Sequence, residues 1–311
     1  MYRLIYNLNF IRADDFQSFT IDGYTFHPIP EKQPAIKQTY DSTYFIKYNR
    51  HMQVNARVSL PQRQKNSIFN EGGEYAERRK LKFLDDLLLI ISVCIGRNVV
   101  PKSYEKRREF PLCSSKHCET ISKNSNELKV HLETATQEIQ TDEWKIKFDN
   151  GFHIRAFYNA SNIFVAEPRF LADITIWEYL FYCNNRKMEF DKLKNISLNT
   201  KINYLIELYL VDSCSSIPEE RLRVFSDLRN QLSHYGKLPI ESPKSPFQKM
   251  GWPGCEKYLL LFKRLTQALV LKTLNIDALQ QMSTLSIPYF LEELIQSGEV
   301  SLFNQLENLS I

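Results

Sequence analysis

Hydrophobic and polar positions alternate in the first third of the chain, in short runs separated by turn residues. These runs cover residues 4–10, 19–26, 44–48 and 54–60, and the second is interrupted at Asp22-Gly23. A period of two with aromatic and β-branched residues is typical of half-buried strands, and Asp-Gly is a preferred hairpin turn. The pattern predicts that the N-terminal part begins as β structure.

A long helix is predicted next, over residues 74–96. It is charged at first and apolar later, and Gly96 and Pro101 provide stop signals. The longest apolar run, 87–95, is far shorter than the ~20 residues that cross a bilayer. We therefore expect a core helix and no membrane association.

A second hairpin is expected where residues 144–148 and 152–156 flank Asp149-Asn150-Gly151. Asn-Gly supplies the positive φ values of a type I′ turn. With the preceding elements, this hairpin predicts an α+β domain over residues 1–165, to which we assign a sensor or regulatory role.

The hydrophobic period changes to 3.6 from Pro168 onward, which is typical of amphipathic helices. Four helices are predicted, over residues 169–187, 198–213, 218–235 and 254–275. We therefore expect an all-α four-helix bundle over 166–276, followed by a short acidic helical extension over 277–311 with helices at 288–296 and 300–309. The fold class is α+β, with a β-rich N-terminal domain carrying hairpins and one long helix ahead of the bundle.

The third predicted helix has a regular apolar stripe and recognisable ends. Pro218 suits its first turn, and Gly236 suits the left-handed position just after its end, so His234 is placed in the last turn. The stripe consists of Leu222, Phe225, Leu228, Leu232 and Tyr235.

Composition and charge add the expected environment. Hydrophobic residues make up 43% of the chain, which indicates a globular protein, and the net charge is only +4. Residues 217–276 carry ten Lys or Arg against five Asp or Glu, whereas 277–311 carry five acids and no Lys or Arg. The first residues resemble a strand rather than a secretory signal, so we expect a cytoplasmic protein with free thiols. Four cysteines are interpreted as small buried hydrophobic residues: Cys94, Cys183, Cys214 and Cys255.

The polar face of the third helix carries the candidate chemistry. Arg223, Asp227, Asn230 and His234 lie at i, i+4, i+7 and i+11 and therefore share one face, opposite the apolar stripe. Histidine can exchange a proton with a ribose hydroxyl near neutral pH, and arginine can stabilise the charge that grows on a phosphate. These two groups are sufficient to cleave RNA without a metal or other cofactor.

Arg229 points about 140° away from His234 on an ideal helix, since five residues separate them at about 100° each. A two-fold dimer would bring the arginine of one subunit near the histidine of the other, and two-fold dimers are the commonest oligomers. We therefore expect a homodimer with a composite site.

The segment Leu228-Arg229-Asn230-Gln231-Leu232-Ser233-His234-Tyr235-Gly236 resembles the motif of the HEPN superfamily, in particular the ApeA-like group of bacterial defence proteins. The resemblance covers residues 168–276. It implies that Arg229 and His234 are catalytic, that Asn230 supports them, and that the chain is a metal-independent endoribonuclease leaving a 2′,3′-cyclic phosphate. It also implies a toxin or abortive-infection effector that cuts tRNA or other cellular RNA. The resemblance does not extend to regulation, and a phage-derived trigger and an antitoxin are the candidate partners that would control such an effector.

Residues next to this motif are expected to contact the RNA: Arg223, Asp227, Tyr235 and Lys237. The alternative is a catalytically silent module that binds RNA or protein. In that case Arg229 lays its stem on the bundle, and the helix-terminal histidine interacts with the helix dipole.

Other motifs are weaker. Cys113, His117, Cys118 and His131 could hold zinc, but their spacing fits no standard zinc site, and ordinary loop residues are the preferred interpretation. Basic runs at 78–82 and 106–108 could follow a phosphate backbone but are usually solvated faces. Glycine-rich phosphate loops, His-Glu-x-x-His and Gly-x-Ser-x-Gly are absent from the sequence, which argues against nucleotide hydrolysis, zinc proteolysis and serine hydrolysis.

Overall fold

The structure is a computed structural model, and it forms two compact units, residues 1–138 and 139–311. It describes residues 2–6, 8, 15–29, 54–60, 73–96, 99–101, 119–161, 163, 165–210, 219–236 and 246–278.

The first unit contains an antiparallel sheet, which within the described residues has the order β2-β3-β4-β1-β5. Its strands are β1 (Tyr2–Tyr6), β2 (Phe19–Ile21), β3 (Tyr24–Pro28), β4 (Val54–Ser59) and β5 (Val100–Pro101). Asp22 and Gly23 have φ values of 47° and 79°, as a tight hairpin turn between β2 and β3 requires. The predicted β-rich start and its first hairpin are confirmed.

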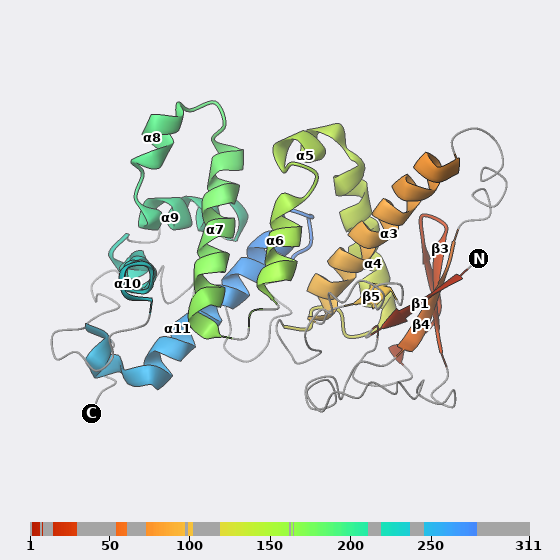
Figure 1. Cartoon of the computed structure of the whole chain (residues 1–311), viewed down its shortest axis with the longest axis horizontal. Coiled ribbons are helices and arrows are strands. Elements are labelled where there is room, and N and C mark those ends of the chain that lie inside the picture. The colour runs from red at the N-terminus through yellow and green to blue at the C-terminus, as the bar shows by residue number, and fades with distance from the viewer. Residues whose placement is uncertain are drawn as a thin grey trace. The chain divides into compact units, whose positions relative to one another are not determined.

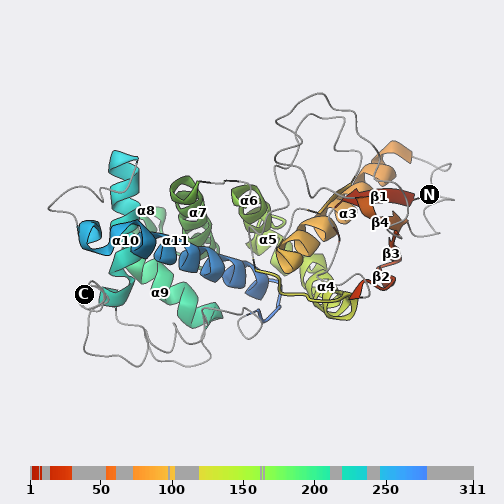
Figure 2. The ribbon, with the colours of Figure 1, turned by 90° about the horizontal axis from the view of Figure 1, so that it is seen from below.

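The described residues of this unit also include the helices α3 (Gly73–Ile95) and α4 (Ser125–Gln140). The ring of Phe83 in α3 lies 5.6 Å from that of Tyr24 in β3, so α3 packs on the sheet (Figure 1). Figure 2 shows α4 on the same side of the sheet as α3, and Ser125 at its start accepts a hydrogen bond from the Gln17 backbone N–H at 2.9 Å. The sequence predicted α3 almost to its ends but did not predict α4.

The second unit is helical throughout its described residues. Its helices are α5 (Asp142–Lys147), α6 (Phe152–Ala160), α7 (Ala166–Asn184), α8 (Phe190–Lys194), α9 (Leu198–Tyr209), α10 (Glu219–Tyr235) and α11 (Pro246–Lys272). Phe262 of α11 lies at the centre of the core. Its ring centroid is 5.2 Å from that of Trp177, 5.0 Å from that of Phe170 and 4.9 Å from that of Phe225, so α11 joins α7 to α10.

The second hairpin prediction is wrong. Residues 144–156 form α5 and α6, and Asp149, Asn150 and Gly151 make a left-handed turn between them, with φ values of 46°, 55° and 81°. Trp144 and Phe148 are buried whereas Ile146 is 70% exposed. This burial follows the i, i+4 spacing of a helix, not the i, i+2 spacing of a strand. The positive φ values expected of Asn-Gly are present, but they connect helices.

The four predicted helices of the second half correspond to α7, α9, α10 and α11. Their ends differ from the predicted ones by a few residues, as helix ends commonly do, except that α11 begins eight residues earlier, at Pro246 rather than 254. The short helix α8 was not predicted. Several predictions lie outside the described residues: the strand at 44–48, the first-turn position of Pro218, and the helices at 288–296 and 300–309.

Across the described residues, none of the helices combines the length and the apolar character that a bilayer span requires.

Candidate functional site

Helix α10 presents one face to the bundle core. Val224, Phe225, Leu228 and Leu232 are at most 2% exposed. The Phe225 ring contacts the rings of Phe262 and Tyr258 on α11, at centroid distances of 4.9 Å and 6.3 Å. The spacing of these residues, three or four positions apart, fixes which way the rest of the helix points.

The end of α10 is defined by Gly236, which has a φ of 69°. Its backbone N–H donates to the carbonyl oxygen of Leu232 at 2.9 Å. A left-handed glycine after the last turn is the stop signal that the sequence contained. His234 therefore lies in the last turn, as predicted.

The motif residues occupy the other side of α10. Asn230, Ser233 and His234 are exposed, and Arg229 is half-buried. The Nη1 of Arg229 donates a hydrogen bond to Oδ1 of Asn230 at 3.1 Å. This hydrogen bond joins the guanidinium to the amide of the residue that follows it.

His234 has fewer contacts. Its ring centroid lies 6.4 Å from that of Tyr235, with the two planes at 65°. Among the residues that the structure describes, neither nitrogen of the His234 ring has a hydrogen-bond partner. The imidazole is open to a substrate or to another protein surface.

The remaining predicted site residues differ in exposure, and some lie outside the described part of the chain. Asp227 is half-buried on α10. Tyr235 is 68% exposed, which corrects its assignment to the apolar stripe and leaves its ring available for contacts. The side chains of Arg223 and Leu222, and the whole of Lys237, lie outside the described part of the chain.

An exposed imidazole and a guanidinium on one helix could do acid–base chemistry on a phosphodiester. On an ideal helix the two side chains leave the axis about 140° apart, which disfavours their meeting at one substrate atom. A second protein surface carrying the same pair would complete such a site.

Compared with known protein families, with curated proteins and with solved structures, the chain matches none.

Metal binding finds no support in the described residues, where no group of three or more His, Cys, Asp or Glu is placed to hold an ion. His131, one of the four zinc candidates, has its Nδ1 2.8 Å from Oγ of the buried Ser122, and burial lowers its pKa. The other three, Cys113, His117 and Cys118, lie outside the described residues. Cys94, Cys183 and Cys255 are buried free thiols, as predicted, whereas Cys214 is not described.

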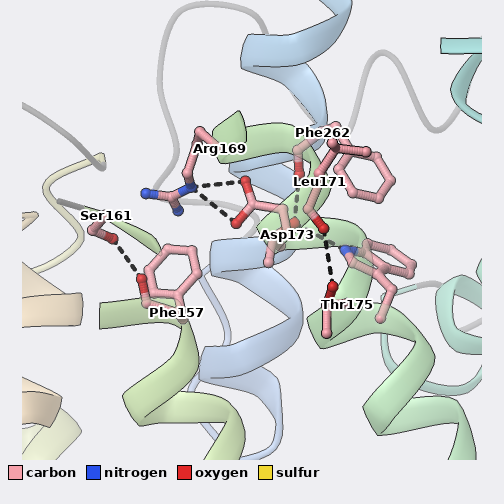
Figure 3. Close-up of polar contacts among 9 residues, drawn as sticks. Phe157, Ser161, Arg169, Leu171, Asp173, Thr175 and Phe262 are labelled. Atoms are coloured by element: carbon pink, nitrogen blue, oxygen red, sulfur yellow. Dashed lines mark hydrogen bonds and ion pairs between the residues drawn. The ribbon is translucent and has the colours of Figure 1, made fainter. Parts of the chain in front are cut away.

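A buried ion pair in α7 was missed by sequence reasoning. Nε of Arg169 donates to Oδ1 and Oδ2 of Asp173 at 3.0 Å and 2.9 Å, and the two side chains are 6% and 1% exposed (Figure 3). Burial raises the pKa of Asp173 to about 6, against the opposing effects of Arg169 and Lys263. A signal was available, because Arg169 and Asp173 occupy the same helical stripe as the buried Ile176 and Leu180.

Proposed function

We propose that the chain is a metal-independent endoribonuclease of the HEPN type, whose bundle includes α7, α9, α10 and α11. The observation that carries the proposal is the geometry of the motif: Asn230 accepts a hydrogen bond from the guanidinium of Arg229, and His234 is exposed five positions after Arg229 on the same helix. This arrangement supplies one group for proton transfer and one for charge stabilisation, which is the minimum that RNA cleavage needs.

In the proposed reaction the imidazole of His234 takes the proton from a ribose 2′-hydroxyl. The 2′-oxygen attacks the adjacent phosphorus, and the bond from phosphorus to the 5′-oxygen breaks. The leaving 5′-oxygen takes a proton from solvent water, and the His234 imidazolium returns its proton to solvent, which yields a 2′,3′-cyclic phosphate and a 5′-hydroxyl. Arg229 binds the phosphate oxygens, whose negative charge increases in the transition state.

The active form in this proposal is a homodimer in which Arg229 of one subunit and His234 of the other act on the same phosphate. Tyr235, exposed next to His234, would stack on a base of the RNA, and Asp227, Arg223 and Lys237 would contact the flanking strand. The biological role we propose is that of a toxin or abortive-infection effector that cuts tRNA or other cellular RNA when a phage-derived trigger or loss of an antitoxin releases it.

The first test compares purified wild type with His234→Ala and Arg229→Ala on total RNA in the presence of EDTA. Both variants should lose roughly 100-fold or more of the cleavage rate, His234→Ala because it removes the general base and Arg229→Ala because it removes a group that stabilises the transition-state charge. Ser233→Ala is the matched control, because Ser233 is an exposed neighbour on the same turn. New ends should carry 5′-hydroxyl groups. Wild-type cleavage that persists unchanged in His234→Ala would exclude the mechanism.

The dimer is tested by mixing the two inactive variants. A heterodimer of Arg229→Ala and His234→Ala chains holds one intact composite site, so random reassortment of the two-fold dimer should restore about a quarter of wild-type activity. A site built within one subunit would give no recovery.

The alternative is a catalytically silent module that binds RNA or protein. The half-buried position of Arg229 favours it, because the stem of an arginine can serve packing alone. Wild-type protein that binds RNA without cutting it, with binding unaffected by His234→Ala, would support this second function.

A further inference from the structure

The guanidinium of Arg169 is buried, but only its Nε donates hydrogen bonds to groups of the described residues. Asp173 accepts hydrogen bonds from Nε alone, and Nη2 is buried with no hydrogen-bond partner among the described residues. Buried polar groups nearly always have partners, and a charged donor without one is costly. We therefore expect Nη2 to donate to an acceptor, and none of the described protein groups is that acceptor.

The free part of the guanidinium forms a two-nitrogen fork. Figure 3 shows both terminal nitrogens of Arg169 directed away from Asp173, on the side where Ser161 at the end of α6 is drawn. One face of the guanidinium is covered by the ring of Phe157, whose centroid lies 5.0 Å from Cζ. The Nη1/Nη2 edge that remains is the planar donor pair that matches two oxygens of a phosphate or carboxylate.

Arg169 and Asp173 form an ion pair at the start of α7, and the charges around that pair bear on what the free edge could bind. Arg169 lies in the first turn of α7, and the residue before that helix, Val165, makes no side-chain cap to its N–H groups. Helix N-termini carry partial positive charge, which favours oxyanions. Lys263 of α11 is close enough to lower the pKa of Asp173. Glu167, two positions before Arg169, points about 200° away around the helix.

We propose that the Nη1/Nη2 edge of Arg169 binds a terminal phosphate group, either as free inorganic phosphate or as the 5′-phosphate of a nucleotide. The 6% exposure of the Arg169 side chain argues for a terminal group, because a phosphate inside a nucleic-acid strand is flanked by two riboses that need more room. The proposal is independent of RNA cleavage, since neither α10 nor His234 contributes to it.

The test measures binding to the full-length protein by calorimetry, with inorganic phosphate, AMP and adenosine as probes and with sodium chloride at matched ionic strength as the background. We expect phosphate or AMP to bind and adenosine not to bind. Tighter binding of AMP than of phosphate would identify the nucleotide as the source, and equal binding would identify free phosphate. Absence of binding by both would overturn the proposal.

The variant Arg169→Lys tests whether phosphate binds at Arg169. Arg169→Lys keeps the positive charge beside Asp173 but removes the fork, and should weaken phosphate binding by about tenfold or more. Arg155→Lys is the matched control, because the Arg155 guanidinium is half-exposed and donates to the carbonyl oxygens of Asn150 and Asp149. Equal weakening in both variants would contradict the assignment.

A measurement on the wild type avoids dependence on how well Arg169→Lys folds. Crystals soaked in tungstate, a heavy tetrahedral oxyanion, should show anomalous density within hydrogen-bond distance of the Arg169 Nη atoms. Tungstate bound only elsewhere, or a water in its place at Nη2, would overturn the proposal.

Discussion

At the residue scale, His153 is held neutral by the groups around it. Its Nε2 lies 2.7 Å from Oγ1 of Thr273, and that hydroxyl donates its own proton to the carbonyl oxygen of Val270 at 2.7 Å. Nε2 must therefore carry the proton and donate it, which leaves Nδ1 as a buried acceptor with no partner among the described residues. Burial, with a smaller effect from Arg155, lowers the pKa of His153 to about 3.

This histidine should make the protein less stable in mild acid. The unfolded chain binds a proton near pH 6.5 and the folded chain only near pH 3, so stability is lost as pH falls through that interval. Relative to His153→Gln, which can still donate to Thr273, the wild type should lose about 2 kcal/mol more between pH 7 and pH 5. Urea unfolding at each pH measures the difference.

The same comparison between pH 7 and pH 8 is the control. The histidine is neutral in the folded chain and mostly neutral in the unfolded chain over this range, so the wild type and the variant should shift equally to within about 0.2 kcal/mol. Any titration of Asp173 occurs in both proteins and cancels. A wild-type loss no larger than that of His153→Gln at pH 5 would show that the histidine is not held neutral.

At the scale of the elements, two glycines place helix ends for different reasons. Gly236 ends α10 with a φ of 69°, and a Cβ built on it meets no atom of the described residues within 4 Å. Gly151 precedes α6 with a φ of 81°, and a Cβ there would lie 3.0 Å from Cη2 of Trp144. Trp144 has little freedom to move, because its Nε1 donates to the carbonyl oxygen of Thr273 at 2.8 Å.

Alanine should therefore be tolerated better at position 236 than at position 151. Gly236→Ala incurs only the left-handed backbone strain, about 1 kcal/mol. Gly151→Ala adds overpacking against Trp144, for a total of about 2 kcal/mol or more. Chemical denaturation followed by circular dichroism gives both values. Equal losses, or a larger loss at Gly236, would contradict the packing that we describe around Gly151.

At the scale of the whole molecule, α5 and α6 belong to the helical unit. Trp144 and His153 both bond to Thr273 just after α11, and Phe152 contacts Tyr179 of α7 at a ring centroid distance of 4.8 Å. The compact units divide between residues 138 and 139. The boundaries expected from the sequence, near 165 and 276, remain predictions, and the first can be tested with fragments.

A fragment of residues 139–311 should fold with a cooperative thermal transition, because it keeps α5 and α6 against α7 and α11. A fragment of 166–311 loses those helices and exposes the core surface that they cover, so it should melt without cooperativity or at a temperature several degrees lower. Circular dichroism melts of both fragments measure this. Equal transitions would support the boundary near 165.

The sequence by itself determined the elements whose signals are local. The period of 3.6 placed α7, α9, α10 and α11, and Gly236 placed the end of α10 and thereby His234. The Asp22-Gly23 turn placed the first hairpin. The sequence contains a further local signal at the start of α4. There Oδ1 of Asn124 accepts a hydrogen bond from the backbone N–H of Glu127 at 2.9 Å. A polar residue followed three positions later by glutamate is typical of a helix start.

In some segments the local sequence pattern fits two structures equally well, and there only the tertiary structure decided between them. Residues 144–148 alternate as a strand would, yet 144 and 148 are also one helical turn apart. Packing against α11 selected the helix, because it buries Trp144 and leaves Ile146 exposed. The burial of Arg169 with Asp173 likewise depended on α6 and α11 covering them. A chain can show which face of an element is apolar, but which polar groups are enclosed depends on the neighbouring elements.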